Sequence, residues 1–123
     1  MPVPILKQGS YLIATIQSAL TDTDLAQLRE DLVARVGQTR ALGVVIDVTS
    51  LDVLDSFATR TLRTIAYACK LRGAEPVIVG IQPEIAFTMV QLGWTAALKG
   101  VETALDLEAG LALLNQRLGD REP

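Results

Sequence analysis

The sequence contains no histidine and only one cysteine, Cys69. The lack of histidine excludes Ser-His-Asp and Cys-His catalysis, imidazole general bases and most zinc or iron sites. A single cysteine forms neither a disulfide within the chain nor a CxxC motif, which fits a reducing compartment. We therefore expect a protein that is not an enzyme and holds no metal or cofactor, with Cys69 as a small core residue.

Long apolar runs and basic clusters are also missing. No stretch approaches the ~20 apolar residues that cross a bilayer, and residues 1–7 lack the layout of a signal peptide. The 11 basic and 14 acidic residues give a formal net charge of -3, with no basic patch for a phosphate backbone. We expect a cytoplasmic protein with protein partners, which binds neither nucleic acid nor membrane.

Aromatic residues are scarce, at 4% of the chain, although 50% of the residues are hydrophobic. The core must therefore consist of Leu, Ile, Val and Ala, as in the strands and helices of α/β proteins. Of the few aromatic residues, Phe87 and Trp94 are expected to pack in or beside this core. A length of 123 residues is typical of a single domain, so we expect residues 1–123 to form one.

The spacing of apolar residues predicts an α/β fold. Strands are expected at residues 3–6, 12–16, 44–48, 77–81 and 97–101, the first two joined as a hairpin. Helices are expected after a cap cluster at residues 21–24, through residues 58–69, over residues 83–92, and after a Thr103–Asp106 capping box. This order indicates a mixed, mainly parallel β-sheet opened by a hairpin, with about four helices packed against it.

Polar side chains concentrate in residues 46–60, between the central strand and the second helix. Open α/β folds place functional groups at this kind of strand exit. Ser56 follows an aspartate at a helix start, which is typical of a capping or first-turn residue. No histidine could activate it, and Lys70 and Lys99 lack a Ser-x-x-Lys spacing. We interpret Asp47 as the anchor of a turn.

Residues 51–58 and 72–80, together with the hairpin and the strand that ends in Asp47, resemble the STAS family of anti-sigma-factor antagonists. The similarity spans nearly the whole chain. Within the family, residues 55–60 and 81–90 are most similar to the RsbS branch, the short scaffold subunits of the stressosome. The resemblance implies the STAS fold and a scaffold that is not an enzyme.

The resemblance also implies a switch at Ser56, on which the serine of the family's Asp-Ser motif falls. In relatives this serine is phosphorylated by a serine kinase of the RsbT type. Unphosphorylated scaffold, in a large complex with itself and RsbR-type paralogues, holds the kinase inactive. Phosphorylation releases the kinase to activate the general stress response, and a cognate serine phosphatase resets the scaffold.

Four neighbours of Ser56 are candidates for partner contact, namely Asp52, Asp55, Thr59 and Arg60, with Thr59 also a candidate second phosphorylation site. Two other functions stay open. One is a simple anti-sigma-factor antagonist of the SpoIIAA type, which binds an anti-sigma kinase without a large assembly. The other is a small-ligand-binding or enzymatic α/β domain, supported only by the usual position of sites in such folds.

Overall fold

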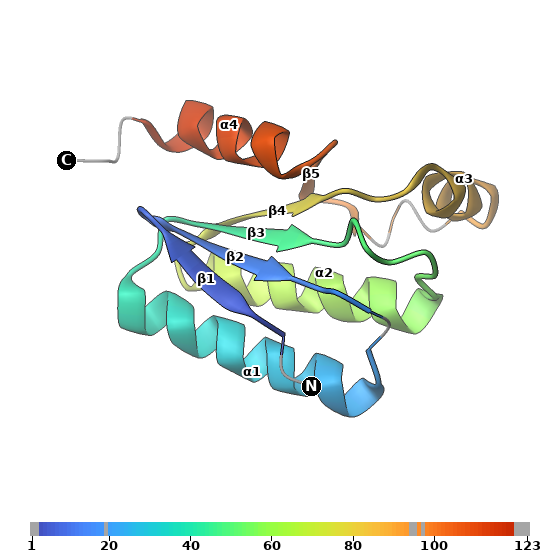
Figure 1. Cartoon of the computed structure of the whole chain (residues 1–123), viewed down its shortest axis with the longest axis horizontal. Coiled ribbons are helices and arrows are strands. Elements are labelled where there is room, and N and C mark those ends of the chain that lie inside the picture. The colour runs from blue at the N-terminus through green and yellow to red at the C-terminus, as the bar shows by residue number, and fades with distance from the viewer. Residues whose placement is uncertain (1–2, 19, 94–95, 97, 120–123) are drawn as a thin grey trace.

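The computed structural model describes residues 3–18, 20–93, 96 and 98–119, which form one five-stranded sheet with helices on both faces (Figure 1). The strands lie side by side in chain order; β1 is antiparallel to β2, and the other neighbouring pairs are parallel. The strands are β1 (Ile5–Gln8), β2 (Tyr11–Thr15), β3 (Gly43–Asp47), β4 (Glu75–Val79) and β5 (Glu102–Ala104). The helices are α1 (Asp22–Thr39), α2 (Ser56–Leu71), α3 (Pro83–Gln91) and α4 (Leu107–Leu118). The predicted fold class is confirmed.

The order of the strands places α1 and α2 on the same face of the sheet. Right-handed crossovers that always step in the same direction place their helices on one face. In Figure 1, α1 and α2 accordingly lie together below the sheet, whereas α4, which follows the last strand, lies above it. The described helices include none that is long and apolar enough to span a membrane.

β3 is the centre of the core. Val44, Val45 and Ile46 are each 0% exposed. Val44 and Ile46 belong to the apolar cluster with α1 and α2, whereas Val45 belongs to the cluster with α4. The β-branched run at residues 44–48 predicts this burial on both faces.

Two of the predicted helix ends are confirmed. Thr21 caps α1 with a capping box, in which the Asp24 amide donates to Thr21 Oγ1 at 3.1 Å and the Thr21 amide donates to Asp24 Oδ2 at 3.2 Å. The hydrogen bonds that the Asp24 carboxylate accepts from the backbone and the side chain of Thr21 lower its pKa. Gly73 follows α2 with a φ of 96°, the left-handed conformation that commonly ends a helix.

The prediction is wrong in the region before α4. β5 begins at Glu102 and not at residue 97, and Ala97 itself lies outside the described residues. Thr103 pairs with Ile78 in the sheet and therefore does not cap a helix. The N-cap of α4 is Asp106, whose Oδ1 accepts from the Ala109 amide at 2.8 Å. The predicted tail at residues 120–123 also lies outside the described residues.

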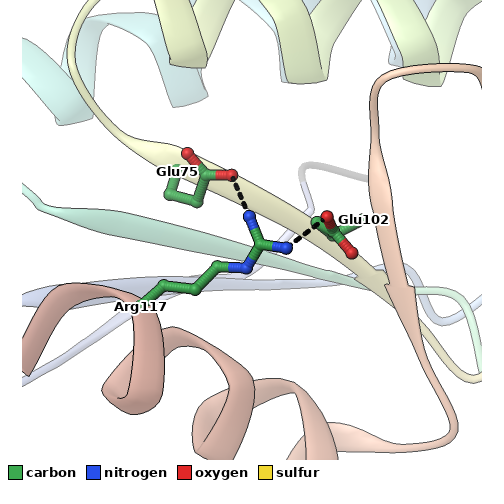
Figure 2. Close-up of polar contacts among 3 residues, drawn as sticks. All are labelled: Glu75, Glu102 and Arg117. Carbon is green, nitrogen blue, oxygen red and sulfur yellow. Dashed lines mark hydrogen bonds and ion pairs between the residues drawn. The ribbon is translucent and has the colours of Figure 1, made fainter.

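Figure 2 shows the ion pairs that join α4 to the sheet. Arg117, in the last turn of α4, lies 2.6 Å from Glu102 Oε1 through Nη2 and 3.8 Å from Glu75 Oε1 through Nη1. All three side chains are partly exposed, so these pairs stabilise the fold by at most about 1 kcal/mol.

Gly80 permits close packing between the segments that follow β3 and β4. Its φ is 83°, and a Cβ at residue 80 would lie 2.9 Å from the Cα of Thr49. Gly73 also has a positive φ but has open space around it, with nothing within 4 Å of the position of a Cβ. A comparison of substitutions at the two glycines therefore separates the effect of backbone strain from that of steric overlap.

We predict that Gly80→Ala lowers the free energy of unfolding by about 2–4 kcal/mol, because a Cβ is unfavourable at positive φ and would overlap Thr49. Gly73→Ala, the matched control, should lower it by about 1 kcal/mol through the backbone alone. Urea denaturation of both variants measures the difference. Equal losses would show that the contact with Thr49 does not constrain residue 80.

Candidate functional site

The carboxyl edge of the sheet brings three helix starts together. The segments after β2, β3 and β4 lead into α1, α2 and α3. Each start carries an acidic residue, Asp22 in α1, Asp55 before α2 and Glu84 in α3. Carboxylates are favourable there because the helix dipole is positive at its N-terminus.

The segment between β3 and α2 is held in place by Thr49 and its neighbours. Asp47 Oδ1 accepts from the amide and from the hydroxyl of Thr49, at 2.9 and 2.6 Å, which confirms Asp47 as a turn anchor. Gln82, before α3, donates through Nε2 to the Thr49 carbonyl at 2.7 Å. Leu51 and Leu54 bury their side chains in the core. The segment therefore delivers Ser56 to a defined position.

Asp55 fixes the start of α2. It is the N-cap, and its Oδ1 accepts from the Ala58 amide at 2.8 Å. The Asp55 carbonyl accepts from the Thr59 amide and, at 2.9 Å, from the Thr59 hydroxyl. Ser56 is consequently the first residue of α2.

The Ser56 hydroxyl differs from the threonine hydroxyls of the same helix. Thr59, Thr61 and Thr64 each donate to the carbonyl four residues earlier, at 2.9 to 3.0 Å. Ser56 is exposed, and its hydroxyl has no hydrogen-bond partner among the described residues. A first-turn residue has no helical carbonyl four residues before it, so Ser56 presents a free hydroxyl at the surface.

The other predicted site residues divide into two groups. Asp52, Asp55 and Arg60 are exposed around Ser56. Thr59 is 0% exposed, and its hydroxyl is bonded to the backbone of Asp55. Thr59 therefore offers no surface to a partner or a kinase, and its predicted role in contact or modification is wrong; it supports the helix start instead.

The structure adds apolar residues that the sequence did not single out. Val53, in the segment before α2, and Phe57, the residue after Ser56, are 67% and 43% exposed. Phe57 is apolar yet does not fall on the buried stripe of α2, and this mismatch was the available signal for it. Glu84 joins Asp52 and Asp55 around a hollow between this segment and α3. The surface near Ser56 therefore combines exposed apolar side chains with acidic ones.

The cavity between the starts of α1 and α2 includes Phe57 and Leu54 in its lining and, at about 90 Å³, is too small for a typical ligand. Two more hollows near Ser56, one lined by Asp52, Asp55 and Glu84 and one by Asp22, Arg29 and Arg60, measure about 310 Å³ each. Small-molecule pockets usually measure about 300–1,000 Å³. In the described sheet the parallel strands also keep their chain order, so they form no switch point of the kind at which doubly wound sheets bind ligands.

Two further predictions concern residues outside the Ser56 surface. Cys69 is 0% exposed, as predicted, and burial raises the pKa of its thiol to about 11. Phe87 is 70% exposed, so its predicted packing in the core is wrong; Ile85 and Met89 supply the buried side of α3 instead. Trp94 lies outside the described residues.

The fold and the sequence together show the family. The family model for the STAS domain matches residues 3–108. The chain belongs to the STAS family. Among solved STAS structures, a serine-to-glutamate variant of RsbS from Moorella thermoacetica is 35% identical, with a TM-score of 0.80 over 95% of this chain and 97% of that one.

Two other STAS relatives are informative. A chain in the structure of the stressosome, described as a signal integration and transduction hub, is 35% identical, with a TM-score of 0.74 over 93% of this chain and 97% of that one. The RsbT co-antagonist protein RsbRA of Bacillus subtilis (strain 168) is 34% identical over 95 residues, covering 70% of this chain. The STAS chain matches 35% of the length of that protein.

The N-cap role of Asp55 yields a stability prediction. Asp55→Ala removes the acceptor for the Ala58 amide and should lower the free energy of unfolding by about 1 kcal/mol, or the melting temperature by about 4 °C. Asp55→Asn removes the same charge but keeps a capping oxygen, so it should stay close to the original protein. Thermal denaturation compares them. If both variants lose stability equally, the carboxylate does not act as a cap.

Proposed function

We propose that this chain is a stressosome scaffold and antagonist that binds and sequesters an RsbT-type serine kinase and releases it when Ser56 is phosphorylated. Residues 1–123 act as one STAS domain with no catalytic activity of its own, in the cytoplasm. RsbR-type paralogues share the complex, and a cognate serine phosphatase restores the unmodified state. The output is regulation of the general stress response.

The observation that carries the proposal is the free, exposed hydroxyl of Ser56 at the first position of a capped helix. A kinase can approach this hydroxyl without unfolding α2, because no helical hydrogen bond depends on it. The threonine hydroxyls of α2 are less suitable acceptors, since each is already bonded to a backbone carbonyl.

The surface around Ser56 suits a protein partner. Val53 and Phe57 offer exposed apolar area near Ser56, and Asp52, Asp55 and Glu84 add negative charge on the side of α3. Interfaces commonly combine an apolar centre with a polar rim. A phosphoryl group adds about -1.5 to -2 charges and would lie against partner groups that match a neutral hydroxyl. Repulsion and desolvation would then weaken the complex.

The relatives support the class of partner. RsbRA is named as a co-antagonist of RsbT, and the stressosome contains a chain 35% identical to this one. Because RsbRA is about three times as long as the matched region, its whole activity is not carried over. What we carry over is the shared STAS module and its place in a large complex with the kinase.

We predict that the full chain gains one phosphoryl group from its cognate kinase and ATP, and that Ser56→Ala gains none. Intact mass spectrometry measures the transfer. Ser56→Asp should bind the kinase at least about tenfold more weakly than the unmodified chain, because it places a carboxylate in the contact. Calorimetry or surface plasmon resonance measures the affinity.

Two controls make these results decisive. Thr64→Ala, which removes an exposed hydroxyl two turns along α2, should still gain one phosphoryl group. Ser56→Asn has nearly the size of Ser56→Asp without the charge, so its affinity should stay close to that of the unmodified chain. Phosphorylation of Ser56→Ala would refute the site, and equal affinities for the Asp and Asn variants would refute repulsion as the cause of release.

A further inference from the structure

α2 carries a row of basic side chains on the same side as Ser56. The row consists of Arg60, Arg63 and Lys70, and all three residues are exposed. At about 100° per residue, each lies within about 40° of Ser56 around the helix axis. The acidic surface before α2 therefore meets a basic row that begins one turn after Ser56.

Arg60 is the member of the row that can reach Ser56. Residues four apart on a helix have Cβ atoms about 5–6 Å apart, which a guanidinium spans easily. Arg63 begins about 10 Å farther along the axis than Ser56. Its guanidinium carbon lies 5.0 Å from the centre of the Tyr67 ring, and Tyr67 is itself fixed by donating to the Lys99 carbonyl at 2.7 Å. Arg63 is thus held away from Ser56.

Arg60 has no ion-pair partner among the described residues, where the ion pairs belong to Arg117. Across a hollow from α1, Asp22 and Arg29 face Arg60 without bonding to it in the described structure. The guanidinium is therefore available to a new anion that appears on its own side of α2.

We propose that Arg60 binds the phosphoryl group of phosphorylated Ser56 one turn along the same helix. The proposal rests on the proposed function only in taking Ser56 as the modified residue. The planar guanidinium can donate two parallel hydrogen bonds to phosphate oxygens. The order, with the anion four residues before the cation, is the favourable one on a helix.

This pairing makes the switch act through two changes of charge. Unmodified Ser56 leaves Arg60 free at the rim, where it can meet an acidic group of the kinase. Phosphorylation adds negative charge at the centre and also engages Arg60 within the chain. The positive charge of Arg60 also offsets the repulsion between the new phosphate and Asp52 and Asp55, so the modified domain stays folded. The partner then faces one available cation fewer and one anion more.

The second ionisation of the phosphoserine measures this contact. Its ordinary pKa is about 6, and a nearby guanidinium favours the dianion and lowers that pKa. Phosphoserine is incorporated at position 56 of the full chain during translation, and ³¹P NMR measures its second pKa. We expect Arg60→Gln to raise this pKa by about 0.5. Arg63→Gln, which removes the same charge from the same row, should change it by about 0.1 or less. Arg60→Lys should keep more than half of the effect.

The comparison isolates Arg60 because the other charged groups near the phosphate are identical in every sample. These are Asp22 and Arg29 of α1, Asp52 and Asp55 before α2, and Glu84 of α3. An unchanged pKa in Arg60→Gln overturns the proposal. An equal shift in Arg63→Gln also overturns it, because it would indicate a long-range electrostatic effect of the basic row instead of a contact with Arg60. The phosphoserine is installed without the kinase, so a kinase that fails to modify Ser56 would overturn the proposed function and leave this result intact.

Discussion

The hydrogen bond from the Ala58 amide to the Asp55 carboxylate, 2.8 Å long, decides where α2 begins. It makes Ser56 the first helical residue, which frees the Ser56 hydroxyl from the backbone bonds that engage Thr59, Thr61 and Thr64. The buried hydroxyl of Thr59 donates to the backbone carbonyl of Asp55 and so stabilises the same helix start. The site thus combines a rigid backbone with one free hydroxyl, which suits a residue that changes charge without changing fold.

Charged residues of opposite sign lie on the two sides of Ser56. Carboxylates lie before α2 and at the start of α3, where helix dipoles favour them, and arginines follow Ser56 along α2. A phosphoryl group at the boundary would meet repulsion on one side and attraction on the other. Val53 and Phe57 supply apolar area that is indifferent to the modification. We propose that the partner is held mainly by apolar contact and that charge determines whether it stays.

The main features of the fold follow from local patterns in the sequence. The β-branched run of β3, the capping box at Thr21 and Gly73 after α2 each act through neighbouring residues, and each was predictable. β5 was not, because a three-residue edge strand depends on pairing with β4, and Thr103 and Asp106 fit a capping pattern equally well. At the site, the positions of Asp55 and Ser56 followed from sequence. The burial of Thr59 and the exposure of Phe87 did not, since both depend on how the helices pack.

We propose that phosphorylation of Ser56 changes a surface and leaves the fold of the domain unchanged. Two-dimensional ¹H–¹⁵N NMR spectra of the full chain before and after phosphorylation test it most directly. We expect the amide chemical shifts to change within residues 47–64 and the adjoining starts of α1 and α3, while those of β1 and α4 stay in place. Shift changes that spread through β3, β4 and α4, or a loss of dispersed signals, would contradict it.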